Sequence, residues 1–340
     1  MIARLLSHDL PRSRWLAAAL IVILVALAFA PFLFPGAKSM SVAAKILVFI
    51  LLVASYDLLL GYTGIVSFAH TMFFGLGAYA MALATMGRLP GLEAFPSSWL
   101  GLALACLVPW ATAQLLGFFL FHGRGLRGAY FGITMLALAV LAERLTQGTA
   151  WLGGLNGLIG VPPLALGLDG GGPALLDPLP TYWVMLGVAF AVFLGLEMLL
   201  ASSRGLAMTA VRENEDRLGF LGYDVAAIKR HGFALSAAIA GLAGALFASQ
   251  FGFVSPKLIG FGLSAEVLIW TALGGREMLL AAFFGALLLS WTETVLAGLL
   301  GAYWLLALAA LLVLSVLFFE RGFVAGILTL LSRGRRPGRR

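Results

Sequence analysis

The sequence predicts an all-α protein that crosses a membrane eight to ten times, with ten spans preferred. Two observations support this fold class. Hydrophobic residues make up 61% of the 340 residues and charged residues only 11%, whereas charged residues are roughly a quarter of an ordinary soluble domain. Apolar runs also recur along the whole chain, and most approach the ~20 residues that a helix needs to cross the hydrocarbon core. No soluble core could bury so much apolar surface, so the solvent around these runs must be lipid.

The apolar runs define ten candidate spans. They lie near residues 15–34, 43–60, 65–86, 98–121, 128–146, 181–200, 232–251, 264–273, 278–298 and 302–319. The run 264–273 is too short to span alone unless it extends back through Gly260, and otherwise it is half of a broken helix. The first run follows two arginines, as a signal peptide would, but its apolar core continues to Phe34. We therefore expect a retained anchor at 15–34.

The positions of the basic residues predict the orientation. With ten spans and the N-terminus inside, most of the 22 Lys and Arg residues fall on cytoplasmic segments, as the positive-inside rule requires. The N-terminal residues 1–14, the loop 201–230 and the basic tail 320–340 are therefore expected in the cytoplasm, while 15–319 forms the transmembrane domain. The tail is expected to bind membrane lipid at the cytoplasmic leaflet. This placement of the charge gives nucleic-acid binding no support.

The loops differ sharply in composition. The outer loop 147–180 is rich in Gly and Pro, which favours turns over a folded domain. The loop 201–230 instead holds nine charged side chains and must lie in water. If this loop is a helix, four apolar residues form one stripe at helical spacing: Met208, Val211, Leu218 and Leu221. Charged residues fall on the opposite face: Arg212, Glu213, Asp216 and Arg217.

The same helix has recognisable pairing and termination signals. Glu213 and Arg217 are spaced for an i,i+4 ion pair, and Gly219 and Gly222 offer places for the helix to end. Two interpretations stay open from this pattern. The segment is either a handle for a soluble partner or a solvated loop with incidental helicity.

Ionisable side chains inside the apolar runs are candidates for lining a polar path, because such groups are costly in lipid. Asp57 and His70 bracket the glycine-rich stretch 61–79, which also contains Ser67, and Glu266 lies in the short run. The glycines of this stretch permit the helix breaks from which midplane binding sites are built. The alternatives are tight packing by small residues and pairing of the ionisable groups within the bundle.

Enzyme signatures are missing from the sequence. The four histidines lack metal-ligand spacing, and no GxSxG or HExxH motif occurs. We therefore expect no catalytic residue, metal or cofactor. No GxxxxGK[ST] phosphate loop occurs either. If ATP drives any activity here, another polypeptide must hydrolyse it, and that polypeptide would dock at 201–230.

Four stretches carry a resemblance to a known family. They read LLLGYTGIVSFAHTMFFGLGAYAMAL at 58–83, LRGAYFGITMLALA at 126–139, LGGLNGLIGVP at 152–162 and SRGLAMTAVRENEDRLGFLGYDVAAIKRHGFALSAAIAGLAGALFASQFGFVSP at 203–256. In this order they resemble the inner-membrane permeases of branched-chain amino acid ABC importers, of the LivM type. The chain departs from that pattern after Gly275, where Arg276 and Glu277 replace the small residues usual in the family.

The resemblance implies partners and site residues. It implies a permease in the bacterial inner membrane, paired with a LivH-type second permease, driven by two cytoplasmic ABC ATPases and fed by a periplasmic substrate-binding protein. Segment 208–222 would be the coupling helix. Its candidate coupling residues are Arg212, Glu213, Asn214, Asp216, Arg217 and Gly222. Asn156, in the third stretch, joins Asp57, Ser67, His70 and Glu266 as a candidate for the substrate path.

The expected cargo is a branched-chain or another small amino acid, and urea or other amides are the alternative that related permeases suggest. A different class also stays open: an ion-coupled secondary transporter that works without an ATPase. In that case Asp57, His70 and Glu266 would relay protons or bind cations.

Overall fold

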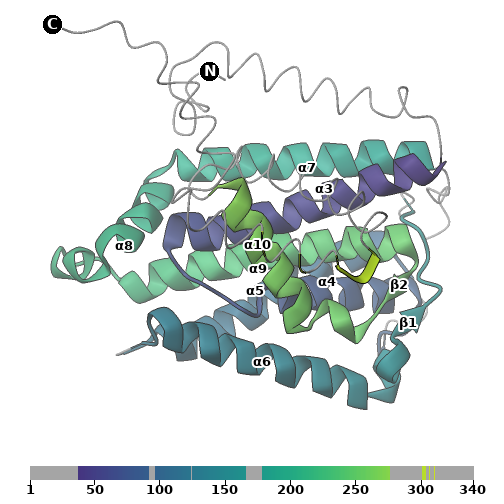
Figure 1. The fold of residues 1–340 in the computed structure, drawn as a ribbon, viewed down its shortest axis with the longest axis horizontal. Coiled ribbons are helices and arrows are strands. Elements are labelled where there is room, and N and C mark those ends of the chain that lie inside the picture. The colour runs from purple at the N-terminus through teal and green to yellow at the C-terminus, as the bar shows by residue number, and fades with distance from the viewer. Residues whose placement is uncertain are drawn as a thin grey trace, which may run out of the picture.

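The computed structural model describes residues 37–91, 96–123, 125–165 and 178–275, together with residues 301–303, 306 and 310. Within these residues the chain forms a bundle of long helices and one pair of very short strands (Figure 1). The candidate spans 15–34 and 278–298, nearly all of 302–319, both terminal segments and the Arg276–Glu277 pair lie outside the described residues. The count of ten spans therefore stays a prediction.

The described elements follow one another in a simple order. The helices are α3 (Ala37–Asp57), continued by the π-helical turn η1 (Leu58–Tyr62), α4 (His70–Thr85), α5 (Ser98–Phe121), α6 (Gly128–Gly148), α7 (Pro178–Leu200), α8 (Ser203–Phe220), α9 (Val225–Phe251) and α10 (Phe261–Gly274). The short elements are the 3₁₀ turns η2 (Ala150–Leu152), η3 (Gly154–Asn156), η4 (Pro256–Leu258) and η5 (Gly301–Tyr303) and the strands β1 (Leu158–Ile159) and β2 (Phe253–Val254).

Five helical segments in the described part of the chain are long and apolar enough to cross a membrane. They are Met40–Tyr62, Ser98–Phe121, Gly128–Gly148, Leu179–Leu200 and Val225–Phe251. These segments coincide with five of the runs found in the sequence, which confirms a polytopic helical membrane protein. The hydropathy signal located them because each holds a mostly apolar stretch of spanning length.

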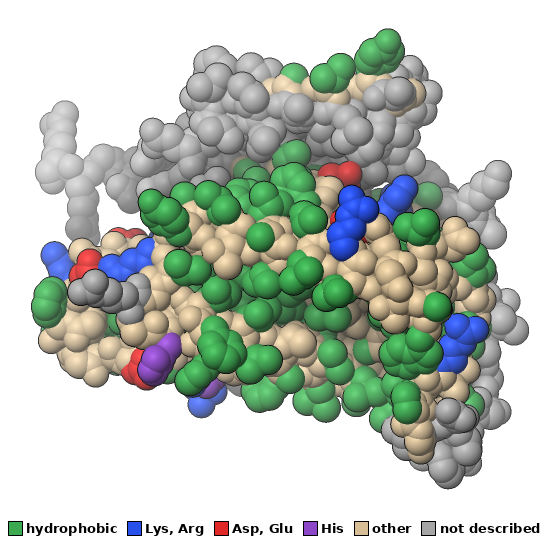
Figure 2. Space-filling view, turned by 90° about the horizontal axis from the view of Figure 1, so that it is seen from below, with side chains coloured by type: hydrophobic (Ala, Val, Ile, Leu, Met, Phe, Trp, Pro, Cys, Tyr) green, Lys and Arg blue, Asp and Glu red, His purple; other side chains and the backbone are tan. Residues whose placement is uncertain are grey.

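The helices are arranged with α3, α4 and α9 buried at the centre and α5, α6 and α7 exposing one apolar face each. Figure 2 shows hydrophobic side chains spread over much of one such face, with charged side chains at the end where α8 lies and others toward the opposite end. An apolar outer face is what a lipid environment requires, because lipid offers no hydrogen bonds to polar groups.

Glycines allow the central helices to touch at their backbones. A Cβ atom at Gly77 of α4 would lie 2.1 Å from the carbonyl oxygen of Gly241 in α9. A Cβ atom at Gly241 itself would lie 2.1 Å from the carbonyl oxygen of Ala105 in α5. Small residues therefore bring α9 into backbone contact with both α4 and α5, a packing mode favoured in membranes.

The glycine-rich stretch forms a break between two helices. After η1 the backbone of residues 64–67 is not helical, and Gly64 adopts a φ of +71°. This left-handed conformation ends the helix, because it suits glycine and few other residues. The predicted span 65–86 is therefore wrong in its first part: helix α4 covers only 70–85, and its 16 residues are buried almost throughout. We name residues 61–69 the α3–α4 break.

The connecting segments meet at two opposite ends of the bundle (Figure 1). At one end β1 pairs with β2 in antiparallel register, Leu158 opposite Val254, and the Ala165 backbone N–H donates to Ser98 Oγ at 3.0 Å. At the other end lie the α3–α4 break, the α5–α6 connection and α8. The assignment of the α8 end to the cytoplasm stays a prediction from the distribution of basic residues.

A candidate functional site at the charged end of the bundle

Helix α8 consists of two halves joined at Asn214. The backbone of Asn214 is extended, with φ −164° and ψ 97°, so the helix is interrupted there. The Asn214 side-chain oxygen accepts the backbone N–H of Arg217 at 2.9 Å, which is how an N-cap residue starts a helix. Asn214 thus ends the first half, Ser203–Glu213, and caps the second half, which ends at Phe220.

The structure of α8 differs from the sequence prediction in three details. The helix runs from Ser203 to Phe220, not from 208 to 222. Glu213 pairs with its neighbour Arg212 at 3.3 Å, not with Arg217, because the extended residue between them breaks the helical spacing. Leu221 lies beyond the helix end and is 69% exposed, whereas Met208, Val211 and Leu218 are buried as predicted. Gly222, with φ +86°, marks the expected stop.

The far end of α8 presents apolar side chains to solvent. Phe220 is 91% exposed, and Leu221 and Tyr223 are exposed beside it. The turn is fixed on its other side by Asp224, whose carboxylate accepts the backbone N–H of Ala227 at 2.9 Å and caps α9. Large apolar side chains gathered in a polar loop are a feature of interaction sites. We call Phe220, Leu221 and Tyr223 the α8 tip.

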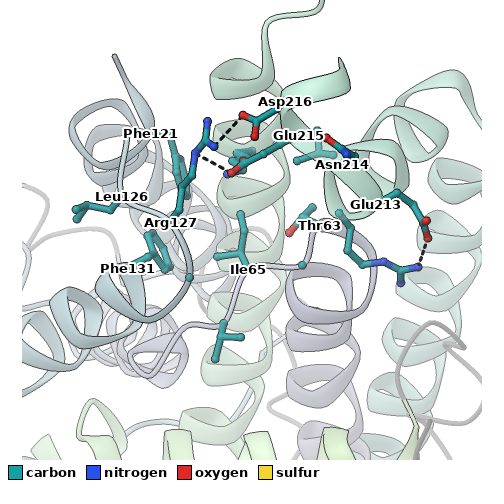
Figure 3. Close-up of a pocket in the computed structure, with 16 residues that line it drawn as sticks. Thr63, Ile65, Phe121, Leu126, Arg127, Phe131, Glu213, Asn214, Glu215 and Asp216 are labelled. Carbon is teal, nitrogen blue, oxygen red and sulfur yellow. Dashed lines mark hydrogen bonds and ion pairs between the residues drawn. The ribbon is translucent and has the colours of Figure 1, made fainter. Parts of the chain in front are cut away.

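A charge network ties the second half of α8 to its neighbours. Arg127, just before α6, contacts Glu215 at 2.8 Å through Nε and Asp216 at 2.8 Å through a terminal nitrogen (Figure 3). Lys229 of α9 contacts the other carboxylate oxygen of Glu215. The hydrogen bond that Arg127 donates to Asp216 and the negative charge of Glu215 raise the pKa of the Arg127 guanidinium. Three segments are therefore joined at one carboxylate.

A cavity of about 350 Å³ opens beside this network (Figure 3). Its walls come from four parts of the chain: residues 63–66 of the α3–α4 break, residues around Arg127, the middle of α8 and Lys229 of α9. Its charged groups include two ion pairs, Arg127 with Glu215 and Arg212 with Glu213. The cavity is therefore a gap that lies between α8 and the break, among segments that are joined by ion pairs.

Three candidates for the substrate path lie around the α3–α4 break. The His70 ring, fully buried, lies with Nε2 2.8 Å from Ser55 Oγ and with its centre 5.0 Å from that of the Tyr56 ring. Asp57, one residue further along α3, is buried as well. Ser67 is buried within the break, and its Oγ accepts the Ala69 backbone N–H.

The other two candidates lie elsewhere. Glu266 is half-buried on α10, which is joined to α4 by a 2.6 Å hydrogen bond between Thr71 Oγ1 and Ser264 Oγ. Asn156 is exposed in η3, at the opposite end of the bundle from α8. The structure thus gathers Asp57, Ser67 and His70, places Glu266 on a helix that contacts them through α4, and separates Asn156 from the rest.

Three residues of the charge network escaped the sequence prediction: Arg127, Glu215 and Lys229. Glu215 lies among the coupling candidates along the chain, but its partners are 88 and 14 residues away. Arg127 belongs to one of the four stretches that resemble the known family. This resemblance was the only signal in the sequence that pointed to Arg127. A single sequence carries no pattern that pairs such distant charges.

The fold is that of a multi-pass membrane protein, with apolar spanning helices and a kinked polar helix at one end. The family model described as "Branched-chain amino acid transport system / permease component" matches residues 39–318. The chain belongs to this family, whose members are transport components of ABC systems with partners such as an ATPase and a binding protein, and are not themselves enzymes. No solved structure is a significant match.

Individual relatives are named for the transport of two different substrates. The chain is 31% identical over 326 residues to the high-affinity branched-chain amino acid transport system permease protein LivM of Salmonella typhimurium, covering 90% of this chain and 73% of the relative. It is 30% identical over 306 residues to LivM of Escherichia coli, with 84% and 70% covered. It is also 31% identical over 211 residues to the autoinducer 2 import system permease protein LsrC of Klebsiella pneumoniae, with 57% and 59% covered.

Proposed function

We propose that the chain is one of two permease subunits of an ABC importer that carries a branched-chain or another small amino acid into the cytoplasm of a bacterium across its inner membrane. The observation that carries this proposal is the form and position of α8. It is a polar, interrupted helix with an exposed apolar tip, held at the end of a bundle whose own sequence has no phosphate loop. A separate ATPase that docks there would supply the work.

The proposed partners follow from the two ends of the bundle. Two cytoplasmic ABC ATPases would bind the α8 ends of this subunit and of a LivH-type second permease. A periplasmic binding protein would deliver cargo at the opposite end, near β1 and β2. The N-terminal segment and the basic tail would lie in the cytoplasm with α8, the tail against anionic lipid.

The proposed mechanism is alternating access driven from α8. Closure of the ATPases would push on the coupling residues Glu213, Asn214, Asp216 and Arg217, with Gly222 ending the helix they lie on. The push would rock the helices about the path residues Asp57, Ser67, His70 and Glu266, while Asn156 would face the binding protein. ATP-driven movement of packed helices requires no chemistry from this chain.

The test is uptake in reconstituted vesicles. We expect the chain, isolated in mild detergent, to retain its ATPases and second permease. In proteoliposomes it should accumulate radiolabelled leucine only with ATP at the ATPase side and binding protein at the other. The LivM relatives favour leucine, whereas the LsrC relative makes autoinducer 2 the competing cargo to be measured in parallel. Uptake that continues without ATP and collapses with an ion gradient would contradict the proposal and support a secondary transporter.

A further inference from the structure

We propose that Arg212 is a positioning residue that ties the docking helix α8 to the α3–α4 break, so that the break moves with α8. This inference rests on the proposed function, because α8 must receive the work of the ATPase. It assigns Arg212 a role inside the permease, where the family resemblance alone would place the residue among those that face the ATPase.

The exposure of the side chains separates these two roles. The Arg212 side chain is 20% exposed, whereas that of its neighbour Glu213 is 71% exposed. One terminal nitrogen of Arg212 donates to the backbone carbonyl of Gly61, and the other contacts Glu213 at 3.3 Å. A side chain that must dock into a partner would be turned outward, and that of Arg212 is turned toward the break.

The acceptor of this hydrogen bond is well suited to a cation. Gly61 belongs to the π-helical turn η1 at the end of α3. The last carbonyl groups of a helix lack partners within the helix and carry the negative end of its dipole. A guanidinium group at this position satisfies a carbonyl and neutralises part of that charge, as basic residues do at helix C-termini. Arg212 therefore holds the point at which α3 stops.

Packing reinforces the hydrogen bond. A Cβ atom at Gly64 would lie 2.7 Å from Cγ of Arg212 and 3.4 Å from its Cα, so the backbone of the break lies directly against α8. Met208, one turn earlier in α8, packs in one buried cluster with Leu58 and Tyr62 of η1. The first half of α8 and the break thus share both polar and apolar contacts, and a shift of one displaces the other.

The route onward from the break is short. Along the chain, Gly61 is followed within a few residues by Ser67 and His70, which are both buried. The second half of α8 is fixed separately through Glu215 to Arg127 and Lys229. Asn214 lies between these two attachments. The first half of α8 is therefore the part that is bonded to the break, and Arg212 makes that bond.

The test compares Arg212→Gln and Arg212→Lys with Arg204→Gln. The control removes the same charge from an exposed position in the same half of α8. Hydrogen exchange of the full-length chain in detergent is measured over residues 61–69, and uptake per ATP hydrolysed is measured in the complete transporter. We expect Arg212→Gln to keep its ATPases, to exchange at least about tenfold faster over 61–69, and to lose at least about 90% of uptake per ATP. Arg212→Lys should recover part of both, because it keeps the cation but not the forked geometry.

Several outcomes would overturn the inference. Loss of the bound ATPase in Arg212→Gln would make Arg212 a docking residue. Unchanged exchange over 61–69, or the same change in Arg204→Gln, would show that Arg212 does not hold the break. The exchange measurement needs no partner, so it tests the contact between Arg212 and the α3–α4 break even if the wild-type complex fails to take up leucine. That failure would count against the proposed function and not against this contact. If Arg212→Gln does not fold, the test rests on Arg212→Lys, which lacks the guanidinium group. Hydrogen exchange and uptake equal to those of the wild type in Arg212→Lys would then contradict the proposal.

Discussion

Replacing Gly244 of α9 by alanine is expected to prevent formation of the stable bundle. A Cβ atom at this position would lie 1.9 Å from the carbonyl oxygen of Phe74 and 3.0 Å from the backbone nitrogen of Ala78, both in α4. The clashing atoms belong to backbone, so no side chain can turn away. A shift of α9 away from α4 would also disturb the neighbouring backbone contact at Gly241, where a Cβ atom would lie 2.1 Å from the carbonyl oxygen of Ala105 in α5. We expect a loss of more than about 3 kcal/mol, at the upper end of overpacking effects.

Gly187→Ala is the matched control for this variant. Gly187 lies within α7, and a Cβ atom there would meet nothing within 4 Å. In a helix interior the change should be neutral or stabilise by up to about 1 kcal/mol, because alanine forms helices better than glycine. Thermal unfolding followed by size-exclusion chromatography in detergent measures both variants. Equal melting temperatures for Gly244→Ala and Gly187→Ala would show that α4 and α9 are not in backbone contact.

Replacing Phe220 at the α8 tip by aspartate is expected to separate the permease from its ATPases. Phe220 is 91% exposed in the isolated chain, so the change should leave the fold intact. A buried aromatic side chain in an interface often contributes 2 kcal/mol or more to binding, and a buried unpaired carboxylate adds a further cost. Association should weaken by at least roughly 30-fold, measured by co-purification and by titration of the purified ATPase.

Leu155→Asp serves as the control for the α8 tip. Leu155 is 76% exposed but lies in η3, at the opposite end of the bundle, and its charge change is the same. We expect this variant to keep its ATPases. If Phe220→Asp co-purified with ATPase at wild-type levels, or if Leu155→Asp lost it, the partner would not bind at the α8 tip.

The sequence predicted the parts of the fold that depend on local composition. Five spans could be located because their apolar runs are long, and the α3–α4 break coincides with glycines that stand beside Ser67 and His70. The start and interruption of α8 were missed. The interruption depends on the side chain of Asn214, which caps a new helical turn, and Asn is also common in ordinary helices and loops. Helical periodicity alone therefore extended the stripe to Leu221.

The candidate site was predictable only in part, because most of its contacts join distant segments. The charges of α8 were visible in the sequence, but their directions were not. Glu215 turns to Arg127 and Lys229, and Arg212 turns to a backbone carbonyl at Gly61. A backbone acceptor has no signature in the sequence, since any residue provides one. Only the packing of α8 on the break shows which charges point inward.

The most direct test of the account is the side of the membrane on which the α8 tip lies. A single cysteine is placed at Phe220 in a Cys106→Ser background and treated with a membrane-impermeant maleimide. The account predicts labelling in inside-out vesicles and none in right-side-out vesicles, with protection in inside-out vesicles when purified ATPase is added. Labelling from the outer face would contradict it, because a helix in the periplasm cannot receive work from a cytoplasmic ATPase.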